Sequence, residues 1–249
     1  MIKKLAFALL SVTASAAMAT TYPGNGGTGF GGPVGGSGAS LSLTNNATTL
    51  FGTITGSAAS PQLFDELVIY IDSQAGGFTT TSGFTDTGGG DTLHKAISGF
   101  DGTIRGILNF APTFGADFAI AISPTQAQFG GLYGLTAAGG TNFLGTVNLS
   151  PTNAAGPYTF SLSLASIGSP TSFNLATTYI NAHSDIYRSN EAYNTVTGTA
   201  NDGAGNFGRN DTLASFSTYT VAAVPEPATV LLLGPALLGG IFFVRRRRA

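Results

Sequence analysis

Cysteine and tryptophan are both absent from this 249-residue chain, and its two histidines are His94 and His183. Without cysteine the chain forms no disulfide bond, so its stability has to come from a buried core. Two imidazoles without cysteine would need carboxylate help to hold zinc, and no H-E-x-x-H motif occurs. The G-x-S-x-G turn of a serine nucleophile is absent too. We therefore expect a protein that is not an enzyme.

Charged side chains are scarce as well: they make up 9% of the chain, against about 25% in a typical globular domain. Between residues 20 and 223, eleven acidic residues accompany only four scattered basic ones, Lys95, Arg105, Arg188 and Arg209. Because nucleic-acid binding needs clustered cations, this composition excludes it. Hydroxyl, amide and glycine residues supply the polarity instead. Such a surface suits an exported β protein that contacts sugar hydroxyls.

The first 19 residues have the three parts of a secretory signal peptide. A basic start that includes Lys3 and Lys4 precedes a short apolar run, and small residues ending in Ala17 and Ala19 follow. This order is typical of a signal peptide that is cleaved after an Ala-x-Ala site, here before Thr20. We expect residues 1–19 to direct export through the inner membrane.

The last 26 residues, 224–249, are built differently from the rest of the chain. They begin with a Pro-Glu-Pro collar made of Val224, Pro225, Glu226 and Pro227. An uncharged run from Ala228 to Val244 follows, and then an arginine cluster made of Arg245, Arg246, Arg247 and Arg248. As a helix the run would span about 25 Å, the short end of what crosses a bilayer. The prolines keep the collar extended, and the arginines favour the cytoplasmic side.

This order of collar, apolar run and terminal arginines resembles the PEP-CTERM protein-sorting signal of Gram-negative bacteria. The resemblance covers about a tenth of the chain and implies one partner, an exosortase. That membrane cysteine transpeptidase removes the tail and passes the protein to the cell surface or the exopolysaccharide matrix. The tail would then reside only transiently in the inner membrane. An ordinary single-span anchor that is never cut would show the same apolar length and basic stop.

Residues 20–38 are glycine-rich and are expected to form a flexible leader. Gly24, Gly26 and Gly29 satisfy the pattern G-x-G-x-x-G, but a dinucleotide site needs a strand before this pattern and a helix after it. Here the pattern follows the predicted cleavage site and runs into more glycine and proline. We therefore do not expect it to bind a phosphate.

Residues 39–223 show the period-two alternation of half-buried strands, with Gly, Pro or Asn between most of them. About ten strands with almost no helical periodicity predict an all-β, two-sheet antiparallel sandwich, jelly-roll-like. The apolar run 67–71 is expected to be the central strand, and 92–99 a short helical turn. The expected strands are a hairpin over 40–55, 67–71, 103–110, 117–122, 128–136, 142–149, 158–164, 173–180 and 216–221.

The start of this body, the hairpin 40–55 followed by the strand that ends at Asp72, is faintly similar to the opening strands of jelly-roll carbohydrate-binding domains of the DOMON and family-9 type. That similarity implies sugar contact. Of the tyrosines that could stack on a sugar ring, Tyr187 and Tyr193 lie in the most polar stretch and are the candidates.

Calcium is the metal that the oxygen-rich loops favour, with Asp72, Asp86 and Asp91 as candidate ligands. The alternative is that these carboxylates cap their own backbone in Asx turns. A glycoside hydrolase would need two carboxylates across a cleft, and no spacing singles out such a pair. Asp65 and Glu66 are adjacent, and neighbouring strand residues point to opposite faces.

These observations predict an exported cell-envelope or extracellular-matrix protein that is structural or binds exopolysaccharide and is not catalytic. The alternative is a secreted hydrolase that acts on matrix polysaccharide. A merely structural domain with no ligand groove is a third possibility.

Overall fold

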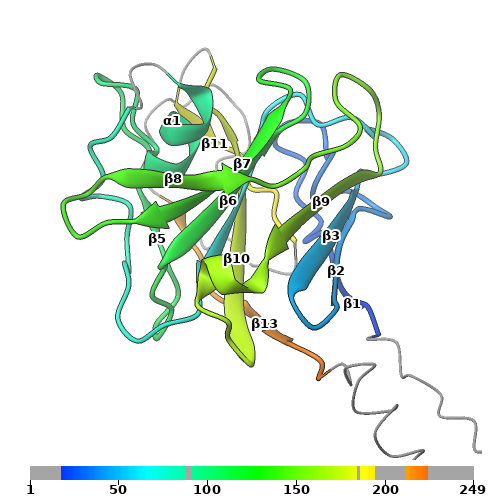
Figure 1. Cartoon of the computed structure of the whole chain (residues 1–249). Coiled ribbons are helices and arrows are strands. Elements are labelled where there is room, and N and C mark those ends of the chain that lie inside the picture. The colour runs from blue at the N-terminus through cyan, green and yellow to red at the C-terminus, as the bar shows by residue number, and fades with distance from the viewer. Residues whose placement is uncertain (1–17, 88–90, 184–185, 194–210, 224–249) are drawn as a thin grey trace, which may run out of the picture.

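The computed structural model describes residues 18–87, 91–183, 186–193 and 211–223. They form two packed antiparallel sheets (Figure 1). The four-stranded sheet has the order β1-β2-β3-β9, and the seven-stranded sheet has the order β11-β10-β4-β6-β7-β8, with β13 also paired to β10. The predicted all-β sandwich of antiparallel sheets is therefore confirmed.

The strands of the four-stranded sheet are β1 (Thr20–Pro23), β2 (Ser40–Asn45), β3 (Thr49–Thr55) and β9 (Tyr158–Ser163). Those of the seven-stranded sheet are β4 (Glu66–Asp72), β6 (Phe118–Ser123), β7 (Phe129–Leu135), β8 (Thr141–Thr146), β10 (Ser172–Asn181), β11 (Tyr187–Arg188) and β13 (Ser217–Thr220). A short parallel pair joins β5 (Leu108–Asn109) to β12 (Asp211–Thr212). The helices are α1 (Thr92–Ser98) and the 3-10 turn η2 (Leu164–Ile167).

Strand β4 is central and buried on both faces, which explains its uninterrupted apolar sequence. It lies between β10 and β6. Leu67, Ile69 and Ile71 pack in the core between the two sheets. Val68 and Tyr70 point the other way, into a second core that the residues of α1 help to form. The larger sheet is therefore covered by the smaller sheet on one face and by α1 with its flanking loops on the other.

Helix α1 has a capping residue at each end. The N–H groups of Leu93 and His94 donate to Oδ1 of Asp91 at 2.7 and 3.4 Å, which satisfies part of the first turn. Gly99 ends the helix in a left-handed conformation, and its N–H donates to the carbonyl of Lys95. The predicted helical turn at 92–99 is confirmed.

Most of the predicted strands are present within a residue or two of the expected bounds, because alternation marks a strand that has one face in a core. The prediction for 103–110 is wrong, since only β5 forms there. The N–H groups of Thr103 and Ile104 both donate to Oδ1 of Asp101 at 2.7 Å. This Asx turn uses the backbone groups that a strand would have paired.

The expected flexible leader is also wrong, because residues 20–38 are part of the sandwich. Thr20–Pro23 pairs with β2 along its whole length. The side-chain amide of Asn25 donates to the carbonyl of Asn190 at 2.8 Å, and the N–H of Ala192 donates back to Oδ1 of Asn25. Val34 is fully buried in the inter-sheet core. The glycines let this segment run close against residues 190–193.

A buried carboxylate organises the glycine-rich segment. Glu191 is fully buried, and the N–H groups of Phe30 and Gly32 donate to its Oε1 at 2.7 and 3.1 Å. The N–H groups of Val34 and Gly35 donate to its Oε2 at 2.9 and 3.3 Å. Successive backbone N–H groups of this kind form the nest that elsewhere holds an anion. In this protein the anion in the nest is the chain's own side chain.

Gly52, on β3, gives a direct test of the packing between β3 and β9. A Cβ built at Gly52 would lie within 2.7 Å of three atoms of the Phe160 ring, which is itself buried. We therefore expect Gly52→Ala to displace the ring and to lower the free energy of unfolding by about 1 to 3 kcal/mol. Urea denaturation measures the change.

The control for that experiment is Gly134→Ala on β7, where a Cβ meets only Leu144, at 3.5 Å. That variant should unfold at nearly the wild-type urea concentration. If both variants lose the same stability, the contact between Gly52 and Phe160 is not the cause.

Ala17 and the whole sorting tail, residues 224–249, lie outside the described residues, so the predicted signal peptide and C-terminal helix stay predictions. Within the described ranges no helix has the length and apolar character needed to cross a bilayer.

Candidate functional site

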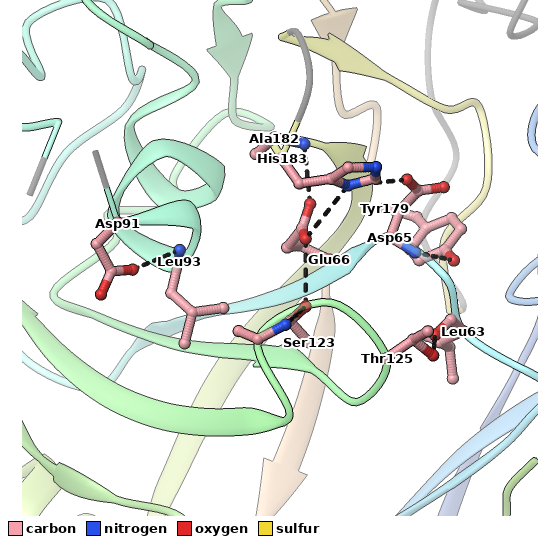
Figure 2. A network of polar contacts seen from close by, with 11 residues as sticks. Leu63, Asp65, Glu66, Asp91, Leu93, Ser123, Thr125, Tyr179, Ala182 and His183 are labelled. Atoms are coloured by element: carbon pink, nitrogen blue, oxygen red, sulfur yellow. Dashed lines mark hydrogen bonds and ion pairs between the residues drawn. The ribbon is translucent and has the colours of Figure 1, made fainter. Parts of the chain in front are cut away.

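A histidine and two carboxylates meet at one end of the seven-stranded sheet (Figure 2). Nδ1 of His183 lies 3.6 Å from Oδ1 of Asp65 and 3.8 Å from Oε1 of Glu66. Glu66 opens β4, and its neighbour on β10 in the ladder is Ile180, so the residues that follow β10 fold over it. We call Asp65, Glu66 and His183 the acid–histidine cluster.

The expectation that Asp65 and Glu66 point to opposite faces needs correction. Asp65 precedes β4 and so is outside the ladder that enforces alternation. Its N–H donates to the hydroxyl of Tyr179 at 2.9 Å. Both carboxylates therefore reach His183 although they are adjacent in the chain.

Glu66 is the fixed member of the cluster. It is fully buried, and the N–H of Ala182 donates to its Oε2 at 2.8 Å. The hydroxyl of Ser123 donates to its Oε1 at 3.2 Å, and that hydroxyl accepts in turn from the N–H of Ala127. Through these hydrogen bonds, Glu66 and Ser123 hold β4, β6 and the end of β10 together.

Asp65 and His183 are the members that can exchange protons near neutral pH. Burial raises the pKa of Asp65 to about 7, and the charge of Glu66 adds to that rise while His183 opposes it. The facing carboxylate of Glu66 raises the pKa of His183, and Asp65 adds to that rise. The Asp65 side chain is 14% exposed and that of His183 is 29% exposed. The pair therefore has pKa values suited to an acid–base couple, and His183 is its more exposed member.

A separate groove of about 540 Å³ lies at the opposite end of β4. It is bounded by the loop after β4, the start of β6, the end of β7 and the start of β8. Phe118, Gly134 and Asn142 are cross-strand neighbours on β6, β7 and β8, so they lie in a row on one face of the sheet. The lining also includes Gln74, Phe78 and Asp117.

The predicted sugar-contact residues lie outside this groove. Tyr193 is fully buried in the inter-sheet core, and its hydroxyl donates to the carbonyl of Thr55 at 3.5 Å. The prediction of sugar contact at Tyr193 is wrong, because its ring fills the core. Tyr187 is half-buried with its ring edge-on to Phe30 at 5.7 Å, and sugar contact there stays a prediction.

The predicted calcium ligands do not come together. In the part of the chain that the structure describes, no three His, Asp or Glu side chains are grouped to hold a metal ion. Asp72 accepts from the Asn174 amide at 3.1 Å. Asp86 accepts from the N–H and the hydroxyl of Thr141, and Asp91 caps α1. A shared site of Asp72, Asp86 and Asp91 is therefore corrected to separate local hydrogen-bonding roles.

Sequence reasoning missed both the acid–histidine cluster and the groove. Asp65 and Glu66 are recognisable in the sequence as adjacent acids, but no local pattern links them to His183. The pairing of β4 with β10 brings His183 close to them. The groove had one local sign in the sequence, Gly134 within the apolar strand 129–135. A glycine inside a strand often marks a place where another group approaches the backbone closely.

Comparison with known proteins identifies the tail. No curated protein and no solved structure matches the chain. The family model described as the PEP-CTERM protein-sorting motif matches residues 223–248, which include the collar, the apolar run and the arginine cluster. The chain therefore carries a PEP-CTERM sorting motif, which marks it as an exported protein that an exosortase sorts.

Proposed function

We propose that this protein is a non-catalytic component of the cell surface or extracellular matrix and that its β-sandwich binds matrix polysaccharide. The destination rests on the sorting motif at residues 223–248. The signal peptide over residues 1–19 starts the export, and the apolar tail holds the chain in the inner membrane until the exosortase acts.

The number of carboxylates in the groove favours binding of a polysaccharide over its cleavage. Of the described residues in the groove lining, Asp117 is the one acidic residue, whereas glycoside hydrolysis requires two carboxylates about 5 to 10 Å apart across the bond that breaks. Oδ2 of Asp117 accepts from the N–H groups of Ser73 and Gln74 at 2.9 and 2.8 Å. Its visible role is to hold the loop after β4 in place.

The alternative function is hydrolysis of matrix polysaccharide, and the acid–histidine cluster is the feature that favours it. A carboxyl group with a pKa of about 7 is suited to act as a general acid at neutral pH. Glu66, however, is fully buried, and its hydrogen bonds hold the sheet. The second carboxylate of the cluster is therefore poorly placed to meet a sugar.

One experiment separates the two functions. The purified full chain is mixed with exopolysaccharide from the producing bacterium, and both co-sedimentation and release of reducing ends are measured. We expect co-sedimentation without new reducing ends, and we expect Asp65→Asn to change neither result. Reducing ends that accumulate with time and disappear in Asp65→Asn would establish the hydrolase instead.

A further inference from the structure

We propose that the groove beside β6, β7 and β8 is a binding site for a neutral saccharide chain. This inference rests on the proposed function and assigns it a place and a ligand class. The floor, the aromatic walls, the polar rim and the charge of the groove each favour such a ligand.

The floor of the groove exists because Gly134 has no side chain. In the row formed by Phe118, Gly134 and Asn142, the central position carries no side chain of its own. The three heavy atoms nearest to a Cβ there would belong to the Leu144 side chain, at 3.5 to 3.9 Å. Gly134 lines the hollow and is half-buried, so a larger side chain at residue 134 would project into the hollow.

Two phenylalanine rings supply the apolar surface that a sugar needs. Phe118 is partly buried and packs against the inter-sheet core. Phe78 is also half-buried, with its ring 4.6 Å from that of Phe84. The backbones of Phe78 and Ala116 exchange two hydrogen bonds at 2.9 Å, so the loop that carries Phe78 is fixed to the start of β6. Rigid, partly exposed rings of this kind present apolar faces against which the C–H face of a pyranose packs.

The rim of the groove carries amides. Gln74 and Asn142 both line it and both are exposed. Within the described part of the chain, the Asn142 side chain makes no hydrogen bond, so its donor and acceptor groups are available to a ligand. Thr136 also lines the groove, and its hydroxyl is engaged with Gly140. A few polar groups around apolar walls is the usual composition of a small-molecule site.

The charge of the groove selects against acidic sugars. Among the described residues that line the groove, Asp117 is the one with a charged side chain, and none of them is a lysine, arginine or histidine. A uronic acid or a sulfated sugar would place its anion beside this carboxylate without a cation to pair it, which costs affinity. A neutral hexose chain meets rings and amides with no such penalty.

The test uses the full chain and two fractions of the exopolysaccharide from the producing bacterium, separated into neutral and acidic material by anion exchange. We expect the neutral fraction to bind and the acidic fraction to bind at least about tenfold more weakly. Gly134→Leu, which fills the floor, and Phe118→Ala, which removes a wall, should each weaken neutral binding by about tenfold or more.

Two matched variants control for folding. Gly134→Ala adds a side chain that fits and should bind nearly as wild type. Phe64→Ala removes an aromatic ring that is 53% exposed at the other end of β4 and should also bind normally. Circular dichroism melts show whether Gly134→Leu and Phe118→Ala remain folded, and Asn142→Ala gives a third loss variant on the exposed rim.

The possible outcomes distinguish a failure of the proposed groove from a failure of the proposed polysaccharide binding. Neutral binding that survives Gly134→Leu, Phe118→Ala and Asn142→Ala overturns the groove while leaving the proposed function in place. Equal or stronger binding of the acidic fraction overturns the ligand class. Failure of both fractions to bind overturns the groove and polysaccharide binding together.

Discussion

Replacing Glu191 by glutamine is expected to lower the free energy of unfolding by about 3 kcal/mol or more. The carboxylate is fully buried and accepts four backbone hydrogen bonds from residues 30–35. An amide offers one oxygen in place of two, so its NH₂ group would face N–H donors that have no other partner. Because a domain is stable by only about 5 to 15 kcal/mol, the loss is a large share of the total.

Urea denaturation of the full chain, followed by tyrosine fluorescence, measures this loss. Limited proteolysis supplies a second readout, because the glycine-rich segment should become the first site of cleavage once its anchor is weakened. The control is Asp72→Asn, where the carboxylate accepts a half-buried hydrogen bond from the Asn174 amide at 3.1 Å and where we expect a change within about 1 kcal/mol. An unfolding midpoint for Glu191→Gln equal to that of wild type would disprove the anchoring role.

Replacing Asp65 by asparagine is expected to stabilise the protein at about pH 8 and to reduce the loss of stability between about pH 5 and pH 8. Folding raises the pKa of this carboxyl from 3.8 to about 7, chiefly through burial. The folded state therefore holds the proton more tightly than the unfolded state, so ionisation costs stability as the pH rises from about 4 to 7. Above that range the full cost applies, about 2 to 4 kcal/mol.

His183 acts in the same direction as Asp65. Its pKa is raised in the folded state, so its contribution to stability is complete below the unfolded pKa of about 6.5 and is lost as the pH rises through the folded value. The groups that act on Asp65 are Glu66, His183 and Glu191. Wild-type protein should accordingly be more stable at about pH 5 than at about pH 8, as long as the other carboxylates stay ionised.

Thermal melts between about pH 5 and pH 8 test this expectation. Asp65→Asn should flatten the profile and raise the melting temperature at the alkaline end. Asp101→Asn, whose carboxylate accepts from the N–H groups of Thr103 and Ile104 away from this cluster, should keep the wild-type slope. A profile for Asp65→Asn that parallels wild type would mean that Asp65 is not the group that titrates.

Much of the fold followed from the sequence, because a strand with one buried face repeats every two residues. The alternation in 40–55 and 158–164 and the continuous run 67–71 were enough to place β2, β3, β9 and β4. The short strands β1, β11 and β12 were missed. They contain two to four residues each, which is too few for a period to be recognised.

The site residues were harder to predict, because each one depends on a contact between distant parts of the chain. Tyr193 sits in a polar stretch and was expected to be exposed, but its neighbours in space are core residues. Gly24, Gly26 and Gly29 read as a flexible segment, since nothing nearby in sequence shows that Glu191 accepts the N–H groups of the residues that follow.

The sequence by itself determined that this protein carries an exosortase sorting motif, because such a motif is recognised as a linear order of collar, apolar run and arginines. It also determined the all-β class, since alternation is a local property of the chain. Only the tertiary structure decided which side chains meet: His183 with Asp65 and Glu66, the glycine-rich segment with Glu191, and Phe118 with Gly134 and Asn142. Strand order and register set those meetings, and they arise from packing across the whole core.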